Sequence, residues 1–131
     1  MAHASRYTIR KLTELEDMAA KHGYSQMGES RFANSELETE QTGLSHQRLQ
    51  PNVRQPFAHK HGSAEEVYIV LSGAGRVKLD DDVVEVSELD AIRVAPGVTR
   101  AFEAGGAGLE LLVFGPRRDG DAELVQGWWL D

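Results

Sequence analysis

The sequence contains no cysteine, so disulfide bonds and thiol catalysis are both excluded, and the cytoplasm is the expected compartment. It also lacks a long apolar run, because its longest one has only the length of a strand, and we therefore expect no membrane span. The N-terminus has no apolar stretch typical of a signal peptide. Basic residues are few: 14 Lys and Arg against 21 Asp and Glu give a net charge of −7. That charge argues against nucleic acid or an anionic membrane as a partner.

The 131 residues predict a single domain, 1–131, with one hydrophobic core. From Gly28 onwards, short β-branched or alternating segments are separated by glycine-containing turns at even spacing. This pattern is typical of an antiparallel sandwich or barrel, so the predicted fold class is all-β. Two of the turns are expected at Gly73-Ala74-Gly75 and at the glycines of 105–108, each separating two strands.

The two ends of the chain differ from this β pattern. Thr13 and Glu16 have the spacing of a capping box, which predicts a short helix from about Glu14 to His22. The C-terminal tail is polar and then contains Trp128-Trp129, which is too much apolar area to leave in water. We expect these rings to cover the open edge of the barrel or to contact a partner subunit.

The most informative stretch is residues 59–73, HKHGSAEEVYIVLSG. His59 and His61 are two residues apart, so on an extended segment their imidazoles point to the same side. Glu66 opens a strand and shares a face with Tyr68 and Val70, the expected interior lining. If these three groups converge, the chain has two imidazoles and a carboxylate, the ligand set of iron, manganese, nickel and zinc sites.

This stretch resembles the first motif of the cupin family: Gly, five residues, His-x-His, three or four residues, Glu, six residues, Gly. The two histidines, Glu66 and Gly73 fit that spacing, while Val53 takes the place of the leading glycine. The resemblance covers about residues 42–115. It implies a double-stranded β-helix, a jelly-roll-like barrel of two antiparallel sheets, with a divalent metal held by His59, His61 and Glu66.

The second cupin motif is present with one important departure. Residues 89–104 align with it without a gap around Pro96-Gly97, but Arg100 stands where the family has its third metal-binding histidine. Arginine stays protonated and offers only donors, so it cannot bind a cation. Either the other three residues hold a metal while Arg100 grips an anionic substrate, or Arg100 replaces the metal and pairs with Glu66. His46, on a nearby strand, could supply a missing ligand if it faced the interior.

Three functions remain open from the sequence: the two described next, and a third in which the pocket has decayed and the protein acts as a scaffold through its dimer. In the first, the protein is a metal-dependent enzyme, of dioxygenase or isomerase type, that acts on a small anionic metabolite. Arg100, Phe102 and Tyr68 would then contact the substrate, with Tyr68 as proton donor. In the second, the protein is a non-catalytic, metal-free sensor or carrier of a small ligand.

The strand that starts at Glu66 also predicts an assembly. Val67, Ile69 and Leu71 point away from the interior, so this strand has two apolar faces. We therefore expect the outer face to pack on another sheet or another chain, with a homodimer favoured over a monomer.

Overall fold

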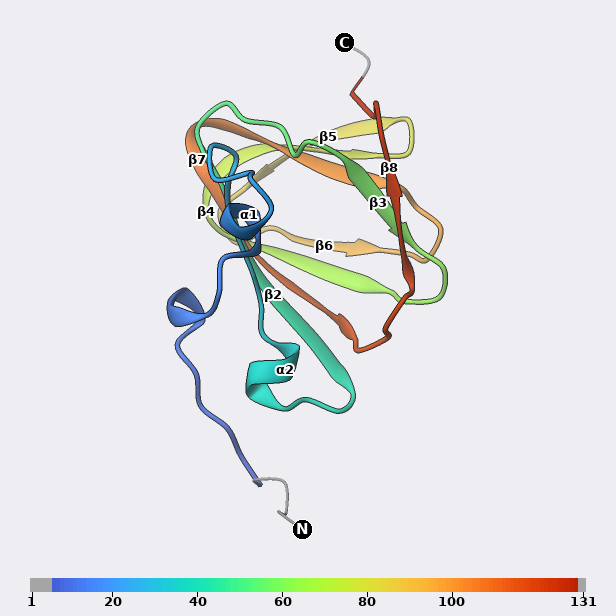
Figure 1. Cartoon of the computed structure of the whole chain (residues 1–131). Helices are drawn as coiled ribbons and strands as arrows, with labels where there is room; N and C mark the ends of the chain where they lie inside the picture. Colours follow the sequence, from blue (N-terminus) through green and yellow to red (C-terminus); the bar gives the residue numbers. More distant parts are fainter. Residues whose placement is uncertain (1–5, 130–131) are drawn as a thin grey trace.

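The structure is a computed structural model that describes residues 6–129. In this part of the chain, eight strands form one antiparallel sheet, which curls into two layers (Figure 1). The strands are β1 (Gly28–Phe32), β2 (Thr42–Leu49), β3 (Ala58–His61), β4 (Glu66–Leu79), β5 (Asp82–Ser87), β6 (Ala91–Val94), β7 (Arg100–Pro116) and β8 (Ala122–Val125). The all-β prediction and the double-stranded β-helix are thus confirmed.

The two long strands, β4 and β7, pass from one layer to the other and pair along most of their length. The first half of β4, Glu66 to Gly73, and the last part of β7, Leu109 to Phe114, lie in one layer. This layer also contains β1, β2 and β6. The remaining halves of β4 and β7 lie in the layer with β3, β5 and β8. The strand that begins at Glu66 and the strand that begins at Arg100 therefore run between both layers.

The expected turns at Gly73-Ala74-Gly75 and at 105–108 are wrong, because both segments continue as strand and bend. Gly73 has a φ of +81° and Gly108 a φ of +80°, and the β4–β7 register shifts between Val70 and Ser72 and between Gly73 and Gly75. A Cβ on Gly73 would lie 2.1 Å from the Gly108 carbonyl oxygen. Only glycine allows the two backbones to approach and bend together at this point.

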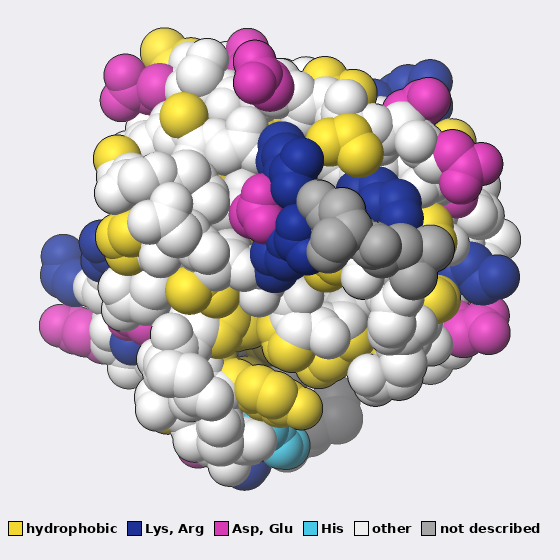
Figure 2. All heavy atoms as spheres, turned by 90° about the horizontal axis from the view of Figure 1, so that it is seen from above, with side chains coloured by type: hydrophobic (Ala, Val, Ile, Leu, Met, Phe, Trp, Pro, Cys, Tyr) yellow, Lys and Arg dark blue, Asp and Glu magenta, His cyan; other side chains and the backbone are white. Residues whose placement is uncertain are grey.

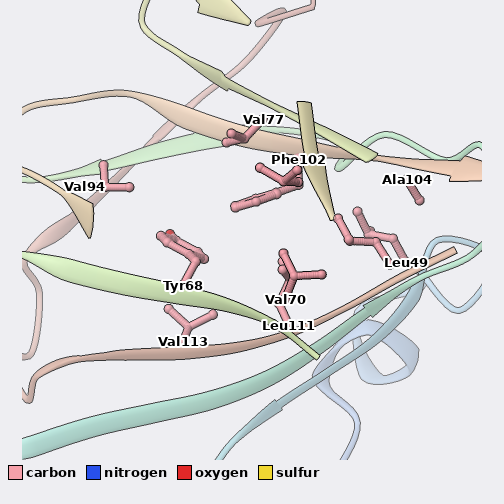
Figure 3. Packing of buried hydrophobic residues seen from close by; sticks show 11 residues of the cluster. Leu49, Tyr68, Val70, Val77, Val94, Phe102, Ala104, Leu111 and Val113 are labelled. Carbon is pink, nitrogen blue, oxygen red and sulfur yellow. The ribbon is translucent and has the colours of Figure 1, made fainter. Parts of the chain in front are cut away.

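The hydrophobic core fills the space between the two layers (Figure 3). One layer contributes Tyr68 and Leu111, and Val77 and Phe102 come from the other. All four side chains are buried, as the alternation of strand residues predicts. Tyr68 is the one that also reaches the group of polar side chains beside the core.

The N-terminal helix is shorter than predicted. A 3₁₀ turn, η1 (Leu12–Glu14), is followed by α1 (Met18–Lys21), and a second short helix, α2 (Asn34–Leu37), follows β1. The capping box does not form: Asp17 caps α1 by accepting from the Ala19 amide at 3.0 Å. The same oxygen accepts from the Ser30 amide at 2.9 Å, which ties the helix to β1.

The outer face of β4 is apolar and half-buried at Val67, Ile69 and Leu71. Neighbouring strands of the same sheet flank it, and no second sheet packs on it among residues 6–129. The homodimer therefore stays a prediction, which the molar mass in solution would test. No helix within residues 6–129 is long and apolar enough to cross a membrane.

Candidate metal centre

Three strands bring the predicted ligands together. β3 carries His59 and His61, β4 begins at Glu66, and β7 begins at Arg100, which lies directly opposite His59 in the β3–β7 ladder. The ligand atoms of His59, His61 and Glu66 all lie within 4.8 Å of one another. The convergence expected from the spacing is therefore present in the structure.

One oxygen of Glu66, Oε1, is the centre of this group. It accepts a hydrogen bond from the Tyr68 hydroxyl at 2.8 Å. Three further nitrogens surround it: His61 Nε2 at 3.3 Å, Arg100 Nη2 at 3.3 Å and His59 Nε2 at 3.5 Å. Two hydrogen-bond donors, Tyr68 and Arg100, and two imidazole nitrogens therefore lie around one oxygen, Glu66 Oε1.

The surroundings of Glu66 favour its ionised form. Burial alone would raise its pKa, but hydrogen bonds from His59 and Tyr68, with the charges of His61 and Arg100, lower the pKa below the ordinary 4.5. An ionised carboxylate is the form that pairs with a guanidinium or binds a metal ion.

The lowered pKa of Glu66 predicts a pH-dependent contribution to stability. A carboxyl group with a pKa below its unfolded value of 4.5 stabilises the folded state above that pH, and the contribution disappears as the pH falls through the folded pKa. Glu66→Gln removes the titrating group. The difference in unfolding free energy between wild type and this variant should therefore shrink below pH 4.5, as urea unfolding at several pH values would measure. A constant difference would contradict the assignment.

Arg100 has no exposed surface, at 0%. Its Nη1 donates to the Val98 carbonyl oxygen at 2.9 Å and its Nη2 to Glu66, while Nε has no hydrogen-bond partner in the part of the chain that the structure describes. The pairing with Glu66 is the arrangement expected in the second alternative, in which the arginine replaces the metal. The guanidinium is fully buried next to Glu66 and does not reach solvent. Contact of Arg100 with a substrate therefore stays a prediction.

Tyr68 and Phe102 are core residues that differ in their distance from the ligands. Burial, and then the negative charge of Glu66, raise the pKa of the Tyr68 phenol strongly, so it stays neutral and donates to Glu66. Its oxygen also lies 3.5 Å from His59 Nε2. Phe102 packs on the Tyr68 ring, with 5.0 Å between ring centroids. Tyr68 therefore contacts the ligand group directly, whereas Phe102 contacts the Tyr68 ring. The roles of both residues in substrate binding stay predictions.

His46 does not supply a ligand to this group. It is buried on β2, opposite Leu112 of β7, and its Nε2 lies 2.6 Å from Glu110 Oε2. Glu110 Oε1 also accepts from the Ser72 hydroxyl at 3.1 Å. His46 thus belongs to a separate polar contact between β2, β7 and β4.

The two tryptophans lie against basic side chains rather than against the ligands. The Lys78 ammonium is 4.3 Å from the Trp128 ring centroid, and the Arg54 guanidinium is 4.8 Å from that of Trp129. Figure 2 shows Lys and Arg side chains gathered on the face seen from above. The half-buried rings contact β4 and the segment before β3, and their contact with a partner subunit stays a prediction.

Asp121 is the residue that sequence reasoning missed. It precedes β8 in the polar tail, and its Oδ2 lies 3.2 Å from His61 Nδ1. A single aspartate in a polar segment gives no local signal of such a contact, because it depends on the pairing of β8 with β3.

Comparisons with known proteins agree with the fold and the motif. A family model described as a cupin domain matches residues 45–115. An uncharacterized protein of Methanocaldococcus jannaschii is 32% identical over 71 residues, which are 52% of this chain and 57% of that protein. This chain therefore covers little more than half of that relative's length.

Two solved structures show the same architecture. A cupin protein from Bacteroides fragilis superposes with a TM-score of 0.71 at 20% identity over 89% of each chain. Oxalate decarboxylase from Bacillus subtilis superposes with a TM-score of 0.72 at 18% identity, over 94% of this chain and 33% of that one. At these identities the likeness shows the fold alone. Since the family model matches more than half of the chain, this protein belongs to the cupin domain family.

Proposed function

We propose that this cupin binds a divalent transition metal, of the Fe, Mn, Ni or Zn group, through His59, His61 and Glu66 and acts on a small anionic metabolite. The observation that carries the proposal is the grouping of the three ligand atoms within 4.8 Å. Their side chains keep 28%, 14% and 16% of their surface exposed, so the group can be reached from solvent. Oxygenation or isomerisation is the expected reaction type.

The donor set fits a metal even with Arg100 beside it. Two imidazole Nε2 atoms and one carboxylate form a two-His-one-carboxylate face with open positions. Within residues 6–129, the contacts of the Glu66 side chain with Tyr68, Arg100 and the two histidines all go to Oε1. Because a carboxylate has lone pairs on both oxygens, Glu66 can accept from Arg100 with one and bind a metal with the other.

The charges of the site support an anionic ligand. Glu66 and Asp121 contribute one negative charge each, and Arg100 contributes one positive charge. With a divalent ion bound, the group would have one excess positive charge, which a monoanion neutralises. The likeness to oxalate decarboxylase is in keeping with a small acid as ligand.

The chain's own groups have separate roles in this proposal. A metal held in this way supplies a Lewis acid that polarises a bound oxygen atom. Arg100 balances the charge of Glu66 and adds to the positive potential that attracts the anion. Tyr68 stays a neutral hydrogen-bond donor and fixes the orientation of the Glu66 carboxylate. His59 is the most exposed of the three ligands, so we expect a small ligand to approach the group from its side.

Elemental analysis of protein purified without added metal tests this function. We expect close to one equivalent of a transition metal in wild type and a large loss in His59→Ala and His61→Ala. His22→Ala is the matched control, because His22 is exposed at the end of α1 and lies outside the group. Binding of small carboxylic acids and phosphate esters, followed by calorimetry, should be weakened by EDTA. Equal metal content in all four proteins would contradict the proposal.

A second candidate is a metal-free binding protein for a small anion. The observation in its favour is the contact of buried Arg100 with Glu66, which gives the carboxylate a permanent positive partner. This function predicts wild-type protein with no transition metal and anion binding that EDTA does not change.

A further inference from the structure

Asp121 lies in the C-terminal segment, beyond the residues 45–115 that match the cupin family model. The strand that follows it, β8, pairs with β3 along its whole length, with His59 opposite Leu124 and His61 opposite Ala122. The Gly62 amide extends this pairing by donating to the Asp121 carbonyl oxygen at 3.0 Å. The tail thus covers the edge of the strand that carries both histidines (Figure 1).

The Asp121 carboxylate turns back over the loop that follows β3. Oδ1 accepts from the Ser63 amide at 3.0 Å and from the Ser63 hydroxyl at 2.8 Å. Oδ2 accepts from the Ala64 amide at 3.0 Å and lies 3.2 Å from His61 Nδ1. Only 13% of the side chain is exposed, so these contacts hold the carboxylate in one orientation.

This contact determines which ring nitrogen of His61 is free. When Nδ1 carries a proton and donates it to Asp121, Nε2 is left on the opposite side of the ring with its lone pair available. Nε2 is the atom that faces Glu66 Oε1, at 3.3 Å. A carboxylate on the far nitrogen also raises the basicity of the imidazole toward a metal. Among residues 6–129, His59 has no such carboxylate on its Nδ1.

We infer that Asp121 is a positioning residue that orients His61 for metal binding, so that the C-terminal segment is part of the metal centre. The inference rests on the proposed metal site, and it adds a residue from outside the segment that defines the family. Asp121 acts through His61 and does not touch the metal itself.

Zn²⁺ affinity of the full-length protein, measured by calorimetry, tests this role. Asp121→Asn keeps the size of the side chain but cannot accept from all four donors, and it should weaken Zn²⁺ binding by about 10–100-fold. Ser63→Ala is the matched control, because it removes one hydroxyl contact of the same carboxylate and leaves His61 untouched. It should change the affinity by less than about twofold. Equal losses in the two variants would overturn the inference.

A double-mutant cycle separates positioning from a general effect on the fold. In a His61→Ala background, Asp121→Asn should weaken Zn²⁺ binding by less than about twofold, since the residue it acts through is absent. In a His59→Ala background it should retain its full effect. An undiminished effect in the His61→Ala background would assign Asp121 a purely structural role and overturn the inference.

An NMR measurement on metal-free protein distinguishes failure of this inference from failure of the proposed function. Wild type and Ser63→Ala should show a protected Nδ1 proton on His61, and Asp121→Asn should lose it. If wild type binds no Zn²⁺, the metal-dependent function fails, and the idea that Asp121 serves a metal fails with it. If Zn²⁺ binds but the Nδ1 proton is unchanged in Asp121→Asn, only the positioning role is overturned.

Discussion

Replacing Glu66 with alanine should lower the free energy of unfolding by about 3–5 kcal/mol, because it leaves a buried charge without its partner. Arg100 is fully buried, carries the positive charge of a guanidinium and has Glu66 as its carboxylate partner. The Val98 carbonyl oxygen would remain as an acceptor, but it carries no charge to offset the guanidinium. Urea unfolding of wild type and variant at neutral pH measures the difference.

The double variant Glu66→Ala/Arg100→Met is the control. It removes both charges and keeps an unbranched apolar side chain where the arginine lies, so it should recover much of the stability lost in Glu66→Ala. Arg100→Met alone should have a smaller effect, because Glu66 is partly exposed and keeps the Tyr68 hydroxyl as a donor. A loss of under about 1 kcal/mol in Glu66→Ala would mean that the pair contributes no more than a surface ion pair.

The ligand group was predictable from the sequence because its geometry is largely local. Alternation along a strand places His59 and His61 on one side, and Glu66 shares a face with Tyr68 and Val70 on the next strand. The resemblance to the second motif put Arg100 at the position of the third histidine, with pairing to Glu66 as one of two alternatives, and the structure places Arg100 Nη2 3.3 Å from Oε1. Spacing along a strand was sufficient for the two histidines, whereas the position of Arg100, on a third strand, came from the resemblance to the cupin motif.

The bend at Gly73 was not predictable, because the local pattern fits two structures. Glycines with positive φ serve tight turns as well as bulges, and the choice here depends on β7, whose Leu109 pairs with Gly73. The start of α1 shows the same limit. Asp17 prevails over Thr13 as the cap because it also binds the Ser30 amide, 13 residues away. Long-range contacts decided both outcomes.

The contact of Asp121 with His61 was even less predictable from local sequence. This contact spans 60 residues and depends on β8, a short strand with mostly exposed side chains. Such a segment lacks both the apolar alternation and the β-branched residues from which a strand is predicted. The ligands of a site can therefore be visible in a sequence while the residue that orients one of them is not.

Changing Arg100 to histidine should raise the affinity for Zn²⁺ by at least about tenfold. Unit charges about 5 Å apart still interact by about 3 kcal/mol at an effective dielectric constant of about 20, so a fixed guanidinium beside Glu66 opposes a divalent ion. Arg100→His removes that fixed charge and offers a fourth ligand atom to His59, His61 and Glu66. Calorimetric titration of protein stripped with EDTA measures the gain.

Arg100→Met separates the two causes of that gain, since it removes the charge and offers no imidazole. Glu66 loses its permanent partner in both variants, and a bound cation then becomes the group that neutralises it. We therefore expect Zn²⁺ affinity to rise from wild type to Arg100→Met and again to Arg100→His, while affinity for a small anion falls in the metal-free forms of both. If neither variant binds Zn²⁺ more tightly than wild type, the arginine does not oppose the metal. A bound cation and the Arg100 guanidinium would then be compatible in the same site.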